Sequence, residues 1–513
     1  MNISHPLRDR RVIVIGAGVA GLTAAARLAH AGFDVLVFDQ ASAPGGKMRC
    51  VQSAAGPVDA GPTVLTMRSV FDQIFAECGA RLEEHVTLLR QPVIARHFWP
   101  DGSQLDLHDT AEANAAAITA FAGARAAREF RRFDRRARQL FDAFDAPMMR
   151  APAPSFRSLA AHVAGRPWLL PKLAPFTSLH GLLARSFSDP RLVQLFGRYA
   201  TYVGGSPYHA PALLALIWRA ESAGVWAVKG GMHRLARALE DLGRAHGARY
   251  HYDMPVKRIT TSDGVVTGIT LGDGTPVSAD AIVFNGDPRA LARGLMGRAS
   301  DHIGRQTLRS ARSLSAEVWA FAAEVTGPEL SYHNVFFRTD PEPEFRALMQ
   351  GKYIDDPTVY VCAMDRNGAA PRPALERFET IANAPPLPAD GREEEAPSCP
   401  TRSFQTLARF GLRFSPTPDP TALTTPRGFA GLHPASAGSL YGQSPHGMTA
   451  ALNRPQARTA LGGLFLAGGG THPGAGVPMA ALSGQHAAAA IMQSPISTSR
   501  SPPTAMPGGM STG

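Results

Sequence analysis

The apolar positions near both ends of the chain predict strands that are followed by helices. Residues 12–15 (VIVI) are a run of β-branched residues, which is typical of a parallel strand buried on both faces. Together with the segment that follows, they predict a strand–helix–strand unit over residues 11–38. Residues 464–467 predict another short buried strand, after which a helix begins near Pro478 and extends to residue 492.

The middle of the chain carries a different pattern. Asp-Gly pairs at 263–264 and 273–274 separate alternating segments, which predicts a β-meander over residues 250–283. Residues 281–287 (AIVFNGD) predict a further buried strand and turn. Helices are expected over residues 111–144, 179–195 and 210–220, and strands over 315–337 and 358–362.

The turn after the first strand has the spacing of a phosphate site. Gly16 allows a tight turn, Gly18 removes a side chain where backbone must approach a pyrophosphate, and Gly21 lets the helix pack close to the strand. The helix N-terminus then presents free N–H groups to the phosphates. Asp39 ends the second strand, where a carboxylate accepts hydrogen bonds from a ribose. These features together predict a dinucleotide-binding unit rather than a glycine turn without a ligand.

The predicted cradle extends beyond this unit. Gly45 and Gly46 precede Lys47, a basic residue that suits a second contact to a phosphate or ribose. Residues 58–63 (VDAGPT) then supply another turn rich in small residues. Simple nicotinamide dehydrogenases do not need this extension, whereas a larger and permanently held cofactor such as FAD does.

A second glycine-rich turn lies near the C-terminus. Gly468, Gly469 and Gly470 follow the predicted strand and permit close backbone approach. Strand, glycine turn and helix is again the geometry that points N–H groups at a ligand, although a flexible connector is the alternative. Because cofactor motifs occur at both ends of the chain, the nucleotide domain is predicted to be discontinuous.

These motifs resemble those of the bacterial phytoene-desaturase-type carotenoid desaturases. The resemblance extends from about residue 10 to about residue 493, and its motifs are residues 16–21, 45–47, 59–63 and 470–476. Within the family, the chain is most similar to the 1-hydroxycarotenoid 3,4-desaturases, also called hydroxyneurosporene or methoxyneurosporene desaturases. The segments that indicate this branch are residues 95–107, 196–218, 224–239 and 467–479. Asp39 stands where many relatives have Glu.

The resemblance implies an α/β fold and a bound FAD. A Rossmann-like FAD-binding domain of the amine-oxidase/glutathione-reductase type 2 class is joined to a second, α+β substrate domain. The backbone around Val256 is expected near the adenine. The residues expected to contact FAD are Gly16, Gly18, Ala20, Gly21, Asp39, Gly45, Gly46, Lys47, Gly61, Pro62, Thr63, Val256, Gly468, Gly469, Gly470, Val477, Pro478 and Met479.

The resemblance also implies an activity. The implied enzyme is an FAD-dependent oxidoreductase that acts on CH–CH groups. It is expected to introduce a C-3,4 double bond into a lipophilic 1-hydroxy carotenoid, such as 1-hydroxyneurosporene or rhodopin. This reaction belongs to spheroidene-type biosynthesis. Phytoene desaturase and carotenoid isomerase are alternatives within the family. A non-enzymatic prenyl-binding chaperone of the same fold is an alternative of another class, and the intact glycine motifs at both ends argue against it.

One absent motif favours oxidation of the substrate over its reduction. No second GxGxxG lies between a predicted strand and helix, so no separate NAD(P)H domain is expected. Electrons are then expected to pass from the substrate through the flavin to a diffusible acceptor, either oxygen or a quinone. Because the flavin carries the hydride step, few polar catalytic residues are required. His472 is a candidate proton acceptor or flavin-orienting group, with a purely loop-stabilising role as the alternative.

The positions of the cofactor motifs divide the chain. The expected parts are, in order, the first FAD-binding part (10–95), a helical substrate- and membrane-facing part (96–224), the second FAD-binding part (225–300), a second substrate part with a sheet (301–455) and the third FAD-binding part (456–493). The Pro-rich acidic segment 384–400 is expected to be mobile, and residues 494–513 are expected to form a disordered tail.

Composition narrows the range of partners. The formal net charge is +10, yet no nucleic-acid motif is visible and aromatic residues are not interleaved with the basic runs, so no nucleic-acid partner is expected. The four cysteines lie too far apart in sequence for a metal or redox pair, and the histidines form no ligand cluster. The sequence therefore predicts no metal site and a reducing, cytoplasmic compartment.

One short segment suggests contact with a membrane. Residues 165–176 (GRPWLLPKLAPF) combine aromatic and aliphatic residues with two cations, which suits shallow insertion at a lipid interface. An ordinary core loop is the alternative. No signal peptide and no run of ~18 apolar residues is present, so peripheral association with the inner or photosynthetic membrane is expected.

Overall fold

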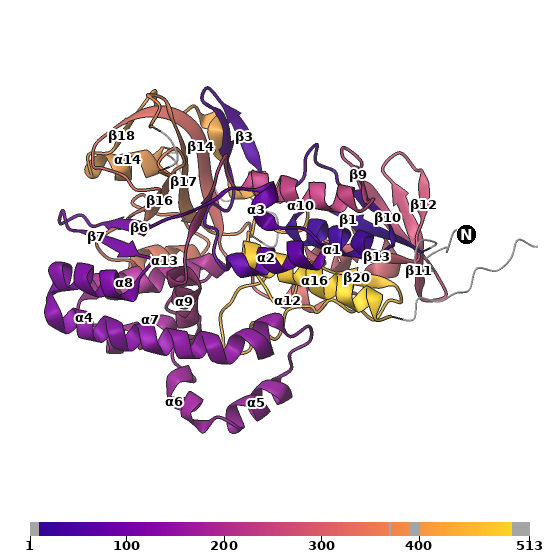
Figure 1. Cartoon of the computed structure of the whole chain (residues 1–513), viewed down its shortest axis with the longest axis horizontal. Helices are drawn as coiled ribbons and strands as arrows, with labels where there is room; N and C mark the ends of the chain where they lie inside the picture. The colour runs from indigo at the N-terminus through magenta and orange to yellow at the C-terminus, as the bar shows by residue number, and fades with distance from the viewer. Residues whose placement is uncertain (1–9, 369–370, 389–400, 495–513) are drawn as a thin grey trace, which may run out of the picture.

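The computed structural model describes residues 10–368, 371–388 and 401–494. Residues 389–400 of the segment expected to be mobile, and 495–513 of the expected tail, lie outside the described residues. Figure 1 shows a parallel sheet with its helices at one end of the molecule, and a larger sheet with a layer of helices at the other. The expected α/β organisation is confirmed.

The parallel sheet joins three distant stretches of the chain. Its strand order is β20-β13-β1-β2-β9, and all of its neighbours are parallel. The strands are β1 (Arg11–Ile15), β2 (Asp34–Phe38), β9 (Arg249–His251), β13 (Ala281–Phe284) and β20 (Leu464–Leu466). The first strand therefore lies between the second strand and a strand from the middle of the chain, and the C-terminal strand forms one edge.

Alternation along β1 explains why this sheet is covered on both faces, because successive side chains of a strand point to opposite sides. Val12 and Val14 belong to the cluster formed with helices α1 (Val19–His30), α10 (His233–Ala245) and α16 (Val477–Met492). Ile13 and Ile15 belong to the cluster on the other face. That face packs on a three-stranded antiparallel sheet of β10 (Val256–Ser262), β11 (Val265–Leu271) and β12 (Pro276–Ser278).

Two expected strands are each divided between the two sheets. The strand expected at residues 250–259 separates into β9 and β10, because Asp253 has a left-handed φ of 54° and Pro255 follows it. The strand expected at 276–283 separates into β12 and β13. In both cases one part of the alternating run pairs in the parallel sheet and the other part in the three-stranded antiparallel sheet. The local sequence pattern does not reveal this division.

The larger sheet lies in the part of the molecule expected to face the substrate, and it is called the substrate-side sheet below. It has eight strands and collects segments from both halves of the chain. Its order is β18-β14-β17-β16-β15-β6-β7, with β19 paired to β14, and only β15 and β6 are parallel. Its strands are β6 (Val93–Phe98), β7 (Gln104–His108), β14 (Ser315–Thr326), β15 (His333–Phe336), β16 (Val359–Ala363), β17 (Glu376–Ala384), β18 (Arg413–Ser415) and β19 (Leu423–Thr424). The single strand expected over 315–337 is thus two strands.

Helices cover one side of this sheet and also differ in detail from expectation. Helix α4 (Ala111–Phe144) is interrupted at Gly123, whose φ is 84°. The helix expected over 179–195 is two helices, α7 (Leu179–Ser186) and α8 (Pro190–Gly197), because Asp189 caps a new helix that starts at Pro190. The segment 210–220 contains a 3-10 turn (Ala212–Ala215) followed by α9 (Leu216–Ser222). Within the described part of the chain, no helix has the length and apolarity to cross a bilayer.

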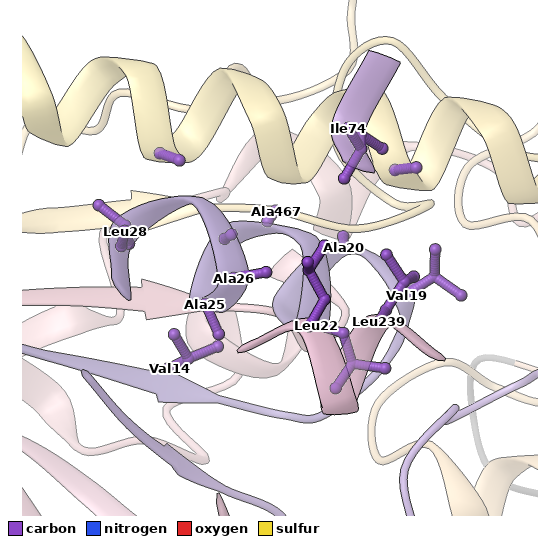
Figure 2. Close-up of a cluster of buried hydrophobic side chains, with 14 of the residues drawn as sticks. Val14, Val19, Ala20, Leu22, Ala25, Ala26, Leu28, Ile74, Leu239 and Ala467 are labelled. Atoms are coloured by element: carbon purple, nitrogen blue, oxygen red, sulfur yellow. The ribbon is translucent and has the colours of Figure 1, made fainter. Parts of the chain in front are cut away.

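Helix α16 packs against α1 at very short range. Figure 2 shows α1 lying beside α16, with Ala20 on the side of α1 that faces α16 and Leu22 on the opposite side, next to Leu239. A Cβ built on Gly484 of α16 would lie only 2.2 Å from the carbonyl oxygen of Ala20, closer than atoms can approach. Glycine at this position therefore lets the C-terminal helix lie directly on the N-terminal one.

This packing predicts that Gly484→Ala destabilises the protein. The added methyl group forces α16 away from α1, and overpacking of this kind lowers the free energy of unfolding by about 1–3 kcal/mol. Gly431→Ala is the control, since Gly431 lies in α15 (Pro426–Leu432) with open space around its Cβ position. Urea denaturation followed by circular dichroism measures both. Equal midpoints for Gly484→Ala and the control would contradict the proposed close packing.

Candidate functional site

The carboxyl ends of four strands meet at one edge of the five-stranded parallel sheet, which is called the cofactor-side sheet below. Gly16 follows β1, Asp39 follows β2, Asn285 follows β13 and Gly468 comes shortly after β20. Since β1 lies between strands from different parts of the chain, this edge is a topological switch point, the place where open α/β sheets bind ligands. The predicted glycine motifs from both ends of the chain are therefore brought together.

Asn285 joins the two glycine turns. Its side-chain Nδ2 donates a hydrogen bond to the carbonyl oxygen of Gly16 at 3.0 Å. A Cβ on Gly18 would lie 2.9 Å from that Nδ2, and a Cβ on Gly468 would lie 3.1 Å from the Oδ1 of Asn285. A side chain on either turn would thus displace the amide. The sequence reasoning missed Asn285, although an Asn-Gly-Asp turn directly after a buried strand was a visible signal.

The second glycine pair lies on the first turn, as the extended cradle requires. The backbone N–H of Gly45 donates to the carbonyl oxygen of Ala17 at 2.8 Å. A Cβ on Gly46 would lie 3.2 Å from Cα of Gly18, and Gly45 has a left-handed φ of 114°. The backbones of the two segments are in contact, so neither position leaves room for a larger residue.

The turn at residues 58–63 is fixed by a buried carboxylate. Asp59 accepts hydrogen bonds from the backbone N–H groups of Met232 at 2.6 Å and His233 at 3.3 Å, next to the start of α10. Burial raises the pKa of Asp59 to about 6. A Cβ on Gly61 would lie 2.0 Å from the carbonyl oxygen of Lys47, so this turn packs directly behind the second glycine pair.

Asp39 is oriented by the glycine turn that follows β1 and by its own loop. Its carboxylate accepts hydrogen bonds from the N–H groups of Ala17 at 2.6 Å and Ala41 at 2.8 Å, and burial raises its pKa. The side chain is half-buried, and a carboxylate has about four acceptor positions, so further acceptor positions remain. The carbonyl oxygen of Asp39 accepts from the N–H of Met254, two residues before Val256, which places the start of β10 beside this carboxylate.

Lys47 is half-buried, and its ammonium group is held by a backbone partner from a distant segment. Its Nζ donates to the carbonyl oxygen of Leu440 at 2.5 Å. Desolvation lowers the pKa of the Lys47 ammonium to about 8, opposed by the nearby carboxylate of Asp287. The segment around Leu440 is therefore part of the site, which nothing in the sequence indicated.

A buried arginine supports the C-terminal glycine turn. Arg454 donates to the carbonyl oxygens of Gly469 at 2.7 Å and Tyr441 at 3.0 Å, and burial lowers its pKa to about 10. A Cβ on Gly442 would lie 2.9 Å from Cα of Gly470. Arg454 thus clamps residues 441–442 to residues 469–470. Its role was not predictable, because it stands in a segment with no recognisable motif.

The start of α16 faces the same edge of the sheet. Gly476 precedes the helix with a φ of 109°. Because glycine has no side chain, it does not cap the first N–H groups of α16. Val477 and Pro478 are buried in the first turn, and Met479 is half-buried against the core. Ala20, in the first turn of α1, is buried against α16.

His472 is held by a neighbouring loop. Its Nε2 lies 2.8 Å from the carbonyl oxygen of Ala151, and its ring stacks on that of His486 with centroids 5.7 Å apart. Burial lowers its pKa to about 4, so the imidazole is neutral at pH 7 and donates this hydrogen bond when Nε2 carries the proton.

The geometry fits a dinucleotide such as FAD. Backbone without side chains surrounds the edge at Gly18, Gly46 and Gly468, while the N-termini of α1 and α16 supply partial positive charge. Asp39 supplies a carboxylate at the position where a ribose is bound in this type of unit. Among the described residues, no group of three or more metal-ligating side chains is present.

Comparison with known proteins agrees with this geometry. Residues 19–492 match the family described as flavin containing amine oxidoreductase. The chain belongs to this family. It is 55% identical to hydroxyneurosporene desaturase of Cereibacter sphaeroides over 96% of this chain and 99% of that protein. It is 51% identical to hydroxyneurosporene desaturase of Rhodobacter capsulatus, over 95% of this chain and 99% of that protein.

Solved structures support the same fold. Putrescine oxidase is similar at a TM-score of 0.59 and 15% identity, covering 94% of this chain and 99% of that one. The protein is an FAD-dependent oxidoreductase with an FAD-binding α/β fold, and these two predictions from the sequence are confirmed. The expected resemblance to the hydroxycarotenoid desaturases is confirmed as well.

Proposed function

We propose that this flavoenzyme is a carotenoid desaturase that introduces a C-3,4 double bond into 1-hydroxy acyclic carotenoids in spheroidene-type biosynthesis. The observation that carries the proposal is the identity of 55% with a hydroxyneurosporene desaturase over nearly the full length of both chains. The substrate side of the molecule fits a lipophilic molecule, because its helical core is built from aromatic side chains. These include Phe130, Phe133, Phe196, Tyr199 and Trp218.

The proposed cofactor contacts follow from the converging strand ends. We propose that the N-terminus of α1 and the backbone at Gly18 bind the pyrophosphate, and that Asp39 binds the ribose of the adenosine half. The backbone at Val256 lies toward the adenine. The remaining proposed contacts are Gly16, Ala20, Gly21, Gly45, Gly46, Lys47, Gly61, Pro62, Thr63, Gly468, Gly469, Gly470, Val477, Pro478 and Met479.

The chemistry requires little from polar side chains. Bound FAD would supply the hydride acceptor, the neighbouring carbon would lose a proton to form the double bond, and oxygen or a quinone would take up the electrons. The aromatic side chains make this part of the molecule apolar, which suits a hydrocarbon substrate. We propose that His472 stabilises its loop rather than accepting a proton, since its Nε2 is occupied by Ala151 and its pKa is about 4.

Pigment spectra of producing cells test this proposal. Cells that make 1-hydroxyneurosporene are expected to form a product absorbing at longer wavelength when they express the protein, because the polyene gains a double bond. Cells that make only neurosporene are expected to show no such shift. Gly18→Val is the inactive control, since its side chain collides with Asn285.

Other outcomes point to the alternatives. Conversion of phytoene would contradict the proposal in favour of a phytoene desaturase. A change of double-bond geometry without a gain in conjugation would favour an isomerase. A purified protein that lacks flavin and ignores added FAD would favour the prenyl-binding chaperone.

We also propose that the protein docks on a membrane surface through the segment at residues 156–176. Helices α5 (Phe156–Ala164) and α6 (Leu170–Leu173) project beyond α4, away from the cofactor-side sheet (Figure 1). Trp168 is 48% exposed and Phe176 is 92% exposed, whereas Leu169 between them is buried and anchors the segment.

Cations accompany these exposed apolar side chains. The Nζ of Lys172 lies 4.3 Å from the ring centroid of Trp168. Arg136 of α4 donates to the carbonyl oxygens of Pro171 and Lys172, which fixes the segment to the helical layer. Aromatic side chains beside Lys and Arg are the composition that binds the interface of an anionic bilayer, and a substrate dissolved in lipid must enter from there.

Vesicle binding tests the membrane proposal. Trp168→Ser combined with Phe176→Ser is expected to weaken sedimentation with phosphatidylglycerol vesicles by about 10-fold or more, because each buried aromatic contributes about 1.5–3 kcal/mol. Leu295→Ser combined with Leu432→Ser is the control, since both leucines are partly exposed elsewhere on the surface. Unchanged binding of the first pair would exclude this segment as the docking surface.

A further inference from the structure

The substrate side of the molecule contains a polar cluster that a hydrocarbon substrate does not require. Arg198, Tyr199 and Tyr202 belong to the 3-10 turn η3 (Arg198–Val203), and Glu221 lies on α9. The surrounding core is aromatic, with Phe196 and Trp218 packed on Tyr199. Burying polar and charged groups in such a core is unfavourable unless they are paired. The presence of this cluster is therefore explained either by a ligand that binds it or by a structural role.

The hydrogen bonds within the cluster are incomplete. Arg198 donates from Nη2 to the hydroxyl oxygen of Tyr202 at 3.1 Å, and its guanidinium lies 5.1 Å from the centre of the Tyr202 ring. Buried atoms without a hydrogen-bond partner in the described structure are Nε of Arg198, the hydroxyl of Tyr199 and Oε2 of Glu221. Burial raises the pKa of both phenols, so their hydroxyls remain protonated donors at neutral pH.

The unpaired groups match the needs of one alcohol. A hydroxyl group donates one hydrogen bond and accepts up to two. The carboxyl group of Glu221 lies within hydrogen-bonding reach of both phenols, and the hydroxyl oxygen of Tyr202 also accepts from Arg198. A single ligand hydroxyl can therefore donate to Glu221 and accept from Tyr202. Tyr202 is only half-buried, which leaves accessible space beside the enclosed groups.

The cluster adjoins the proposed cofactor cradle. The hydroxyl of Tyr360 lies 2.7 Å from Oγ1 of Thr63, which belongs to the predicted FAD contacts, and 2.6 Å from Nδ1 of His333. Tyr360 and Tyr202 are close enough to interact electrostatically. Three bonds separate a hydroxyl oxygen on C-1 from C-3, so a partner for that hydroxyl has to lie next to the cradle, as this cluster does.

Open space also reaches the cluster from the other side. A pocket of about 500 Å³ lies between α7, α8 and the end of the substrate-side sheet. Arg198 and Thr201 of η3 form part of its wall, together with the apolar side chains of Phe187 and Phe337. Arg198 therefore spans from this pocket to Tyr202.

We propose that Tyr202 and Glu221, positioned by Arg198, bind the tertiary hydroxyl of the carotenoid and select hydroxylated over unhydroxylated substrates. This inference rests on the proposed desaturase function and adds its specificity site. A hydrocarbon of the same shape cannot make these two hydrogen bonds, and sites built to hydrogen-bond a substrate hydroxyl reject analogues that lack it by factors of about 10⁴–10⁵.

Kinetics of the FAD-loaded enzyme test the inference. The quantity measured is the ratio of kcat/KM for 1-hydroxyneurosporene to kcat/KM for neurosporene, with both carotenoids presented in detergent micelles. Tyr202→Phe removes the donor and is expected to lower this ratio about 10- to 100-fold. Glu221→Gln replaces the carboxyl group by an amide of the same shape and is expected to lower the ratio as well.

Tyr250→Phe is the matched control. Tyr250 is a buried tyrosine whose hydroxyl also lacks a hydrogen-bond partner in the described structure, but it lies on β9 of the cofactor-side sheet. Its substitution is expected to leave the ratio as in the natural protein. The visible flavin spectrum, recorded for each variant, shows whether FAD is retained.

The outcomes separate this inference from the proposed function. If the natural protein prefers 1-hydroxyneurosporene and both cluster variants keep that preference, the inference is overturned while the desaturase function stands. If the natural protein does not oxidise 1-hydroxyneurosporene, the proposed function fails and the inference fails with it. Should Tyr202→Phe lose its flavin, the ratio for Glu221→Gln decides.

Discussion

The architecture depends on close backbone contact at one junction. Gly18, Asn285 and Gly468 come from the two ends and the middle of the chain, and they meet where a Cβ on either glycine would strike the Asn285 amide. The parallel order of β20, β13, β1 and β2 places these turns at one edge. Because both ends reach the junction, the segments that form the eight-stranded sheet are inserted between them.

Both the cofactor side and the substrate side contain buried polar groups, which are unfavourable unless they have hydrogen-bond partners. On the cofactor side, Asp39, Lys47 and Arg454 each have backbone partners, which holds charged groups in place around a site made largely of glycine backbone. On the substrate side, the polar side chains around Tyr202 lie in an aromatic core and are incompletely paired. A buried group that lacks a partner is unfavourable, and beside the proposed cofactor cradle such a group can be paired by a substrate.

Much of the cofactor domain could be predicted because its signals are local. The apolar run at residues 12–15 and the glycines at 16, 18 and 21 determine strand and turn through neighbours in sequence. The Asn285 turn was visible in the sequence, but its contact with the distant turn at Gly16 was not. The contacts of Arg454 with Gly469 and of Lys47 with Leu440 also join segments far apart in the chain, which local pattern does not reveal. The predicted boundaries of helices and strands were wrong where a new helix cap interrupts a helix, as at Pro190, or where a second sheet takes part of a strand, as at residues 250–259.

The central claim is that the C-terminal glycine turn holds the same FAD as the N-terminal one. Titration of flavin-free protein with FAD, followed by quenching of flavin fluorescence, tests it most directly on Gly468→Ala. Gly468 has a φ of 121° and its Cβ would press on Asn285, so this account predicts at least a ~10-fold weaker affinity with unchanged circular dichroism. Gly431→Ala is expected to bind FAD as the natural protein does. Equal affinity for FAD in Gly468→Ala and the natural protein would contradict the account.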